Sequence, residues 1–295
     1  MSQYISARTN QTSGNTGLGK ESILQLAKHN PKEIFLAART PSKAQAALEE
    51  IKASVPNAKI TFLQLDLSDF SSISSAVESF KSQSPRLDIL LNNAGVMALP
   101  YSTTTQGYEI QFGTNHIGHA LLTKLLLPTL LSTAETTSDV RIVNLSSAGH
   151  NLAPSGGIVF APHPALESYN TWTRYGQSKL ANILHARSLR KYYPQLTSVA
   201  VHPGVILTDL YVSTKENNPL LRWGIGALGA LTMGTVQSGA LNQIWACVAP
   251  KEEVAKSVFF NPVAKASTGS SYARDEELAE KLWVWTEAEL KKHGY

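Results

Sequence analysis

The sequence predicts an α/β fold built on a doubly wound parallel sheet, because short apolar runs alternate along the chain with segments of helical spacing. Strands and helices in alternation are typical of βαβ units joined by right-handed crossovers. No internal repeat, long charge run or low-complexity linker interrupts the 295 residues. We therefore expect a single domain that spans residues 1–295.

Five apolar runs are expected to form strands, at residues 34–38, 60–65, 87–91, 140–145 and 199–201. Between the second and third runs, helical spacing is shown by Phe70, Ile73, Val77 and Phe80. A long apolar helix is expected from Phe112 to Leu131. Near the C-terminus a helical face, which indicates packing rather than chemistry, is formed by Leu278, Leu282 and Trp285.

The composition fits a globular protein with a sizeable core, since 43% of the residues are hydrophobic and 16% are charged. The net charge is +4, and the basic residues are scattered without a Lys/Arg run, so nucleic-acid binding is disfavoured. Cys247 is the only cysteine, which excludes an intrachain disulfide and a cysteine-rich metal site.

The sequence predicts a cytoplasmic protein without a transmembrane segment. Residues 1–11 lack the charged-then-apolar pattern of a signal peptide. Residues 220–233 are apolar, but Arg222 interrupts them and the run is too short to span a bilayer. This run could touch a membrane surface peripherally or close over a lipophilic substrate.

A glycine cluster precedes the first helical pattern and comprises Gly14, Gly17, Leu18, Gly19 and Lys20. Glycines let the backbone approach a phosphate, and a helix N-terminus adds free N–H groups and a positive dipole. In parallel sheets, ligands bind at the carboxyl ends of the strands near the point where the strand order reverses. The cluster favours a dinucleotide phosphate site, with a flexible loop as the alternative.

Arg39 follows the next strand, and no acidic residue stands beside it. In dinucleotide-binding sheets an acid at this place bonds the ribose 2′-hydroxyl, whereas an arginine accommodates a 2′-phosphate. Arg39 therefore favours NADP(H) over NAD(H), and Lys20 could add charge on the same side. The alternative is that both are solvated surface cations.

Tyr175 and Lys179 are four positions apart and would share one face of a helix. An ammonium beside a phenol favours the phenolate, so the tyrosine can exchange a proton near neutral pH. Because Tyr-x-x-x-Lys is common by chance, a surface helix pair is the alternative interpretation.

Further motifs surround this pair and follow one another in a specific order. They are Thr12–Gly19, Leu65-Asp66-Leu67, Asn92–Gly95, Asn115–His119, Asn144–Ser147, Tyr175-x-x-x-Lys179 and Pro203-Gly204. With them the chain, from about Thr12 to its end, resembles the short-chain dehydrogenase/reductase family, and within it the retinol-dehydrogenase-like members. The resemblance implies a Rossmann fold, a nicotinamide cofactor and a small-molecule substrate.

The resemblance implies a catalytic set of Asn115, Ser147, Tyr175 and Lys179. Tyr175 would be the general acid in carbonyl reduction and the base in alcohol oxidation. Lys179 would lower the pKa of Tyr175 and hold the nicotinamide ribose, while Ser147 would polarise the substrate oxygen. Asn115 would anchor a water that relays protons to Lys179. We prefer Ser147 to Ser146 because the serine of the family aligns with the second of such a pair.

The resemblance also implies which residues lie along the cofactor. Asp66 would bond the adenine ring, and the adenine ribose would be lined by Asn93, Ala94 and Gly95. The nicotinamide carboxamide would be held by Ile206 and Thr208. Asp66 and Asn93 each end an apolar run, where a polar side chain faces the ligand crevice. Either could instead be a cap or turn residue.

Two segments are expected to border the substrate. Residues 148–174 are rich in proline and glycine and are expected to form an irregular loop. Residues 209–233 follow Pro203-Gly204, where the family carries its substrate lid. Their apolar character suggests a lipophilic substrate, with ordinary core packing as the alternative. We expect no metal site, because none is indicated by the spacing of His119, His150 and His163.

The first strand departs from the family pattern. Residues 6–12, where a buried apolar strand belongs, include Arg8, Asn10 and Gln11, and Ser13 stands where the first glycine belongs. Burying an unpaired polar group costs on the order of 1–3 kcal/mol. Either the strand is frayed or missing in an active enzyme, or the N-terminus is not the natural one, or the protein has lost cofactor affinity and retained only the fold.

The leading interpretation is an NADP-dependent oxidoreductase that transfers hydride between nicotinamide and a lipophilic ketone, aldehyde or alcohol, with Tyr175 as proton donor and acceptor. The alternative is a catalytically impaired binding or scaffold protein on the same fold. The sequence predicts no particular oligomeric state.

Overall fold

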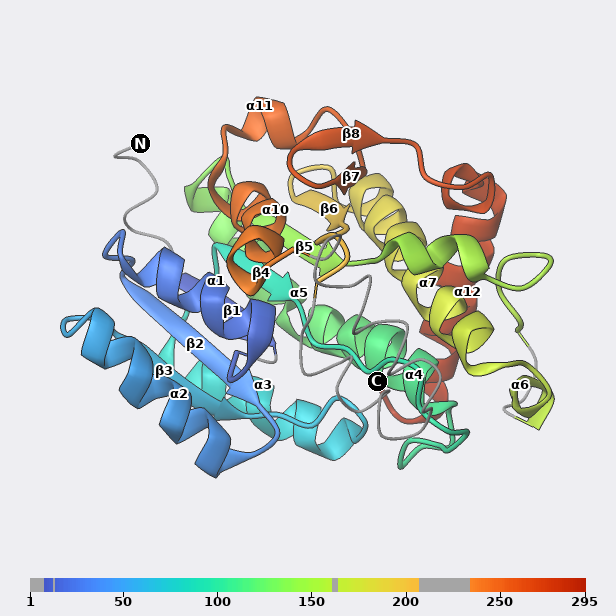
Figure 1. Cartoon of the computed structure of the whole chain (residues 1–295), viewed down its shortest axis with the longest axis horizontal. Coiled ribbons are helices and arrows are strands. Elements are labelled where there is room, and N and C mark those ends of the chain that lie inside the picture. The colour runs from blue at the N-terminus through green and yellow to red at the C-terminus, as the bar shows by residue number, and fades with distance from the viewer. Residues whose placement is uncertain (1–7, 13, 161–163, 207–233) are drawn as a thin grey trace.

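A mostly parallel sheet forms the centre of the molecule. The structure is a computed structural model that describes residues 8–12, 14–160, 164–206 and 234–295. Within these residues the sheet has eight strands in the order β3-β2-β1-β4-β5-β6-β7-β8. Strands β1 to β7 are parallel, and β8 is antiparallel to β7. The expected α/β fold is confirmed (Figure 1).

Every apolar run expected to be a strand is one, with ends that differ by no more than two residues. The strands are β1 (Arg8–Thr12), β2 (Glu33–Ala38), β3 (Ile60–Gln64), β4 (Ile89–Asn92), β5 (Arg141–Leu145), β6 (Thr197–Val201), β7 (Phe259–Asn261) and β8 (Lys265–Ser267). The sequence does not predict β7 and β8, because three residues are too few to show a period.

Helices connect the strands, as the alternating pattern predicts. They are α1 (Gly17–Ala27), α2 (Pro41–Ser54), α3 (Phe70–Gln83), α4 (Ile110–Phe112), α5 (Gly118–Thr136), α6 (Pro164–Glu167), α7 (Thr171–Tyr192), α10 (Val236–Val248), α11 (Lys251–Val254) and α12 (Glu276–Lys292). A π-helical turn, Gly113–Ile117, joins α4 to α5, and 3-10 turns lie at Ala148–Leu152 and Tyr272–Arg274.

Strand β1 is formed in spite of its polar sequence. Its backbone pairs with β2 over Arg8–Thr12 and with β4 over Thr9–Gln11, so it lies inside the sheet. Of the three explanations for its polar sequence, a frayed or missing strand is therefore contradicted, and the other two stay open. The reason is that ladder hydrogen bonds join backbone groups, which every residue here supplies whatever its side chain. Ser13 lies outside the described residues.

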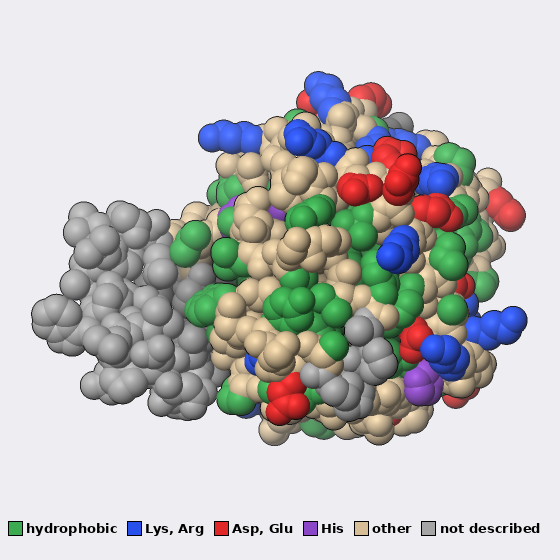
Figure 2. Space-filling view, turned by 90° about the vertical axis from the view of Figure 1, so that its right-hand side faces the viewer, with side chains coloured by type: hydrophobic (Ala, Val, Ile, Leu, Met, Phe, Trp, Pro, Cys, Tyr) green, Lys and Arg blue, Asp and Glu red, His purple; other side chains and the backbone are tan. Residues whose placement is uncertain are grey.

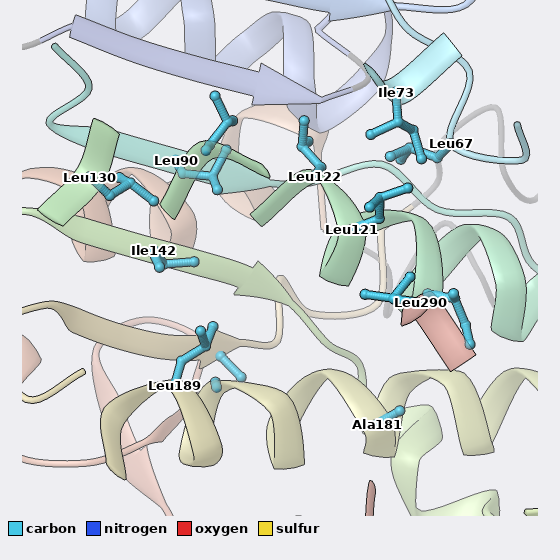
Figure 3. Close-up of a cluster of buried hydrophobic side chains, with 14 of the residues drawn as sticks. Leu67, Ile73, Leu90, Leu121, Leu122, Leu130, Ile142, Ala181, Leu189 and Leu290 are labelled. Atoms are coloured by element: carbon cyan, nitrogen blue, oxygen red, sulfur yellow. The ribbon is translucent and has the colours of Figure 1, made fainter. Parts of the chain in front are cut away.

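Helices cover both faces of the sheet, and each face has its own hydrophobic core. α1, α2 and α10 pack on one face, where Ile23 and Cys247 are buried. α3, α5, α7 and α12 pack on the other face. There Leu90 and Ile142 of the sheet belong to one buried hydrophobic cluster with Leu121 of α5, part of which is drawn in Figure 3. The sheet is thus doubly wound, as expected.

The strand order reverses between β1 and β4. From β1 the chain winds outward through β2 and β3, and then returns to β4 and winds the other way through β5, β6 and β7. Ligands in such sheets bind at the carboxyl ends of the strands beside this reversal. The glycine cluster follows β1 and Asn93 follows β4, so both lie at this place.

One helix among the described residues, Ile110–Thr136, is long and apolar enough by composition to cross a membrane. Much of it is buried inside the protein, because Leu122, Leu126 and Leu130 belong to the core beneath the sheet. Core packing accounts for its apolar composition.

On the face shown in Figure 2, acidic and basic side chains are interspersed among hydrophobic ones, without a large area of one charge.

In its described parts, 148–160 and 164–174, the stretch 148–174 contains more regular structure than the irregular loop that the sequence predicts. It begins with the 3-10 turn Ala148–Leu152, contains α6 and ends inside the first turn of α7. The Asn170 side chain caps α7 by accepting hydrogen bonds from the N–H groups of Trp172 and Thr173. Asn170 is a preferred N-cap residue, and this signal places the helix start four residues before Tyr175.

Candidate active site

A cleft of about 270 Å³ lies where the strand order reverses. Four of the residues that line it were expected beside a cofactor, namely Arg39, Asp66, Ala94 and Gly95. Others were not expected there, including Asn15, Thr16 and Lys43. The cleft therefore brings together the loops that follow β1, β2, β3 and β4.

The glycine cluster forms the turn between β1 and α1. A Cβ atom on Gly14 would lie 2.8 Å from Leu36 Cγ, so a side chain there would collide with β2. Gly17 has a φ of +48°, in the left-handed region that favours glycine. Leu18 and Gly19 follow in the first turn of α1. The turn thus lies at the N-terminus of α1, and its role as a phosphate site stays a prediction.

Arg39 and Lys43 line the cleft, whereas Lys20, which was expected to add charge there, does not. Lys20 Nζ lies 2.5 Å from Glu50 Oε2 on α2, and Lys20 is not among the residues that line the cleft. Lys43, in the first turn of α2, lines it together with Arg39. The sequence carries a signal for Lys43, because it follows Arg39 by four positions.

Asp66 makes the local contacts of a cap or turn residue, whereas the Asn93 side chain bonds a distant segment. Asp66 Oδ1 accepts hydrogen bonds from the backbone N–H and the hydroxyl of Ser68, at 2.9 and 2.6 Å. Asp66 nevertheless lines the cleft. Asn93 Oδ1 accepts a hydrogen bond from Gln243 Nε2 at 3.0 Å. Both side chains are thus held in fixed orientations.

Asn115 is fully buried in the π-helical turn, and its side chain bridges two segments. Oδ1 accepts from the Val96 N–H at 2.8 Å, and Nδ2 donates to the Val96 carbonyl and to Ser178 Oγ, both at 2.9 Å. The Asn115 backbone carbonyl accepts from His119 Nδ1 at 3.0 Å. The partner that a polar side chain needs in an apolar helix is therefore present.

Lys179 reaches the same place from α7. Its Nζ donates to the Leu145 carbonyl at 3.1 Å and lies 5.7 Å from the centroid of the Tyr175 ring. A Cβ atom on Gly95 would lie 3.2 Å from Lys179 Nζ and 3.3 Å from Asn115 Oδ1. Burial lowers the pKa of Lys179 to about 8. The structure thus brings Asn115, Lys179 and Gly95 together.

Ser147 and Tyr175 meet at Gly149. A Cβ atom on Gly149 would lie 2.8 Å from Tyr175 Cε1 and 3.4 Å from Ser147 Oγ. A second glycine, Gly176, allows the backbone after Ser147 to lie directly on α7, since a Cβ there would be 2.6 Å from the carbonyl carbon of Leu152. Two close approaches that only glycine permits therefore place Ser147 beside Tyr175.

The two adjacent serines have different environments. Ser146 is buried, and its hydroxyl donates to the backbone carbonyl of Lys179 at 2.8 Å. Ser147 is only partly buried, and its Oγ accepts from the Gly149 N–H at 3.1 Å. Among the described contacts Ser147 acts only as an acceptor, so its own proton remains available for donation. This difference agrees with the preference for Ser147.

A buried ion pair next to Tyr175 was not expected from the sequence. Arg174 Nε lies 3.2 Å from Glu109 Oε1, and both side chains are buried. The Arg174 guanidinium also donates to the backbone carbonyls of Tyr169 and Leu99. Glu109 Oε2 accepts from two N–H groups at the start of α4. The pair thus ties the start of α7 to the helix that carries Asn115.

His150 holds the backbone at Ser147. Its Nδ1 donates to the Ser147 carbonyl at 2.7 Å, and its Nε2 accepts from the Ser270 N–H at 3.1 Å. These two backbone groups select the neutral ring, and burial lowers the pKa of His150. In the described parts of the chain no three His, Cys, Asp or Glu side chains are grouped so that they could hold a metal ion.

The expected nicotinamide residues lie only in part within the described chain. Ile206 is buried and forms an isolated parallel bridge with Gly234. Thr208 and the expected lid at 209–233 lie outside the described residues.

The comparisons with known proteins bear on this arrangement. A model of the family described as short chain dehydrogenase matches residues 11–219. The chain belongs to this family. Short-chain dehydrogenases are oxidoreductases that act on CH–OH groups of small molecules with a nicotinamide cofactor, and these coarse properties therefore hold for this chain.

Curated relatives place the chain more closely within the short-chain dehydrogenases. It is 42% identical over 298 residues to the short-chain dehydrogenase/reductase drtF of Aspergillus calidoustus, covering 95% of this chain and 92% of that one. It is 38% identical over 274 residues to mouse retinol dehydrogenase 12, covering 92% and 82%. The resemblance to the retinol-dehydrogenase-like branch is thereby confirmed.

A solved structure of a Mycobacterium paratuberculosis protein has a TM-score of 0.73 with this chain at 29% identity, and the match covers 97% of this chain and 93% of that one. This similarity supports the Rossmann fold over nearly the whole chain.

Proposed function

We propose that this short-chain dehydrogenase interconverts a lipophilic alcohol and the corresponding ketone or aldehyde with NADP(H). The observation that carries the proposal is the convergence of Ser147, Tyr175 and Lys179 around the end of β5 and the start of α7. When bound, the nicotinamide would supply or take up a hydride.

Tyr175 would move the proton. Its hydroxyl would donate to the substrate oxygen during reduction and would take the proton back during oxidation. The Lys179 ammonium would stabilise the phenolate that forms, and with a pKa of about 8 it is still mostly charged at pH 7. The Ser147 hydroxyl would donate to the same substrate oxygen and would stabilise the charge that develops there.

Asn115 would support this group by position. Its side chain bonds both the N–H and the carbonyl of Val96, and it would thereby hold the neighbouring Gly95 close to Lys179. The family resemblance assigns Asn115 a water that relays protons to Lys179. His119, bonded to the Asn115 carbonyl, lies on the same side of the helix.

The residues of the cleft fit an NADP(H) dinucleotide better than NAD(H). The turn at Gly17 offers backbone N–H groups to the phosphates. Arg39 and Lys43 line the cleft at the end of β2, where an acid would favour NAD(H), and their charges suit a 2′-phosphate. Asp66, Ala94 and Gly95 would face the adenosine.

A lipophilic substrate is supported by apolar side chains that stay exposed on the segments bearing the site. Leu152, at the end of the turn after Ser147, is 50% exposed, and Val205, beside Ile206, is 47% exposed. A relative whose name assigns it retinol, a lipophilic alcohol, is 38% identical. We further propose a cytoplasmic enzyme whose contact with membranes, if any, is peripheral.

The test is a Tyr175→Phe variant assayed by NADPH oxidation over a panel of ketones and aldehydes. We expect turnover to fall at least about a hundredfold, because the proton donor is lost. Tyr192→Phe is the matched control, since Tyr192 lies on the same helix but is exposed. Unchanged turnover in Tyr175→Phe would refute the assignment.

Cofactor binding by the purified wild-type protein distinguishes the proposed enzyme from the alternative, an impaired binding or scaffold protein. Its motive was the polar first strand, and β1 pairs with strands on both sides. Wild-type protein that binds neither NADPH nor NADH would favour that alternative.

A further inference from the structure

Helix α10 packs beside α1 (Figure 1). Gly239 allows the close approach. A Cβ atom there would lie 2.8 Å from Leu18 Cδ2 and 2.5 Å from Ile206 Cγ1. The inner face of α10 therefore touches the glycine-rich turn and the segment after β6, although no motif for the cofactor lies on α10 itself.

Gln243 stands one turn after Gly239 and has no exposed surface. Its Nε2 lies 2.7 Å from Ser22 Oγ, 3.0 Å from Asn93 Oδ1 and 3.3 Å from the Leu18 carbonyl oxygen. One amide group thus joins α10 to the first turns of α1 and to the end of β4. Because α1 follows β1, these two segments come after the two strands between which the strand order reverses.

The neighbouring groups fix which way this amide faces. The Leu18 carbonyl can only accept, and the Ser22 hydroxyl already donates its proton to that carbonyl at 2.8 Å. The Gln243 group that faces them must therefore be the NH₂. Its second proton then requires an acceptor on Asn93, which turns Asn93 Oδ1 toward α10 and Nδ2 away from it.

We propose that Gln243 is a positioning residue for dinucleotide binding. It holds the Leu18 carbonyl, and with it the N–H groups at the start of α1, at a set distance from the Asn93 amide. This inference rests on the proposed function, because it assumes that the turn at Gly17 and the residues after β4 bind the cofactor. Preorganising both elements before the ligand arrives lowers the entropy lost on binding.

The test compares two buried amides that are adjacent on α10. Gln243→Leu removes the donors toward Ser22 and Asn93 and keeps the apolar bulk. Asn242→Leu is the matched control, because Asn242 bonds the carbonyls of His202 and Phe260 on the sheet side. The dissociation constant for NADPH is measured by fluorescence titration, and the melting temperature is measured for each protein.

We expect Gln243→Leu to raise the NADPH dissociation constant about tenfold or more, and Asn242→Leu to lower the melting temperature with less than a threefold change in that constant. Gly239→Ala is the second variant, because its added Cβ would push α10 away from Leu18, and it should weaken NADPH in the same direction. Dissociation constants within twofold of wild type in both Gln243→Leu and Gly239→Ala would overturn the proposal.

Hydrogen exchange of the unliganded proteins tests the positioning separately from the ligand. Gln243→Leu should speed amide exchange in residues 14–22 and 91–95 more than Asn242→Leu does. Equal exchange in the two variants would overturn the proposal. If wild-type protein binds neither NADPH nor NADH, the proposed function fails, and this exchange measurement still decides whether Gln243 holds the two elements in place.

Discussion

Lys179 and Arg39 are both cations at the candidate site, and their surroundings differ in almost every respect. Lys179 is 4% exposed, bonds the Leu145 carbonyl and lies against Tyr175 and Gly95. Arg39 is exposed on the rim of the cleft at the end of β2. We call the buried surroundings of Lys179 the chemical end and the solvated part of the cleft around Arg39 the adenosine end, after their proposed roles. Buried contacts hold the side chains of the chemical end in place. At the adenosine end, the position of Arg39 is set mainly by the end of β2.

This difference separates what a substitution changes at each end. At the chemical end the side chains belong to the core, so a substitution alters stability and chemistry together. At the adenosine end a substitution alters charge in a solvated cleft and leaves the core intact. If the proposed roles hold, the choice between NADP(H) and NAD(H) is the property that substitution changes most easily, and proton transfer is the property that it changes least easily.

The largest effect should come from breaking the Arg174–Glu109 pair. Glu109→Gln leaves a buried guanidinium without a counter-charge, and we expect the free energy of unfolding to fall by about 3–5 kcal/mol. Chemical denaturation measures it. Glu276→Gln is the control. Glu276 pairs with Arg187, which lies on α7 as Arg174 does, but the Glu276 side chain is largely exposed. A loss below about 1 kcal/mol in Glu109→Gln would show that the chemical end does not depend on this pair.

Acid should lower the free energy of unfolding through the buried side chain of His185. Burial lowers the pKa of His185 from 6.5 to about 4 in the folded protein. The unfolded chain therefore binds more protons between these values, and the free energy of unfolding falls as the pH drops through this window. The slope is up to about 1.4 kcal/mol per pH unit for each such histidine.

His185→Phe should make this fall shallower between pH 6.5 and 4, because it removes one group that must be neutral when folded. Denaturant titrations at several pH values measure the slope. An equal slope in His185→Phe and wild type would mean that His185 is already protonated in the folded state.

The smallest effect on stability is expected at the adenosine end. Arg39→Asp should raise the dissociation constant of NADPH about tenfold and favour NADH, with Lys43→Ala acting less strongly in the same direction. Unfolding free energies should stay within about 0.5 kcal/mol of wild type. Lys20→Ala is the control, because Lys20 pairs with Glu50 away from the cleft lining. NADPH binding that is equally weakened by Lys20→Ala would contradict this division.

How far the sequence predicts the site follows the same division. The family resemblance assigns Ser147, whereas Tyr175 and Lys179 are predicted to share a face because they are four positions apart on one helix. The strands are found because an apolar run is a local signal. Polar β1 is misjudged, since its backbone ladder to both neighbours is a property of the whole sheet.

Contacts between distant segments are what the sequence does not reveal. Glu109 and Arg174 are 65 positions apart, and Gln243 and Asn93 are 150 apart. No period or motif links such residues, and each taken alone is an ordinary polar side chain. The sequence likewise does not reveal that Lys20 pairs with Glu50, because Glu50 lies on another helix.

The residues just before and just after residues 207–233 contact each other. Ile206 bridges to Gly234, and the Gly234 N–H donates to the Val205 carbonyl at 3.0 Å. Since the two ends already meet, the entropy of closing the intervening chain grows only slowly with its length. A change in the number of residues between these two ends should therefore alter the folding free energy only slightly, because β6 and α10 are held by contacts of their own.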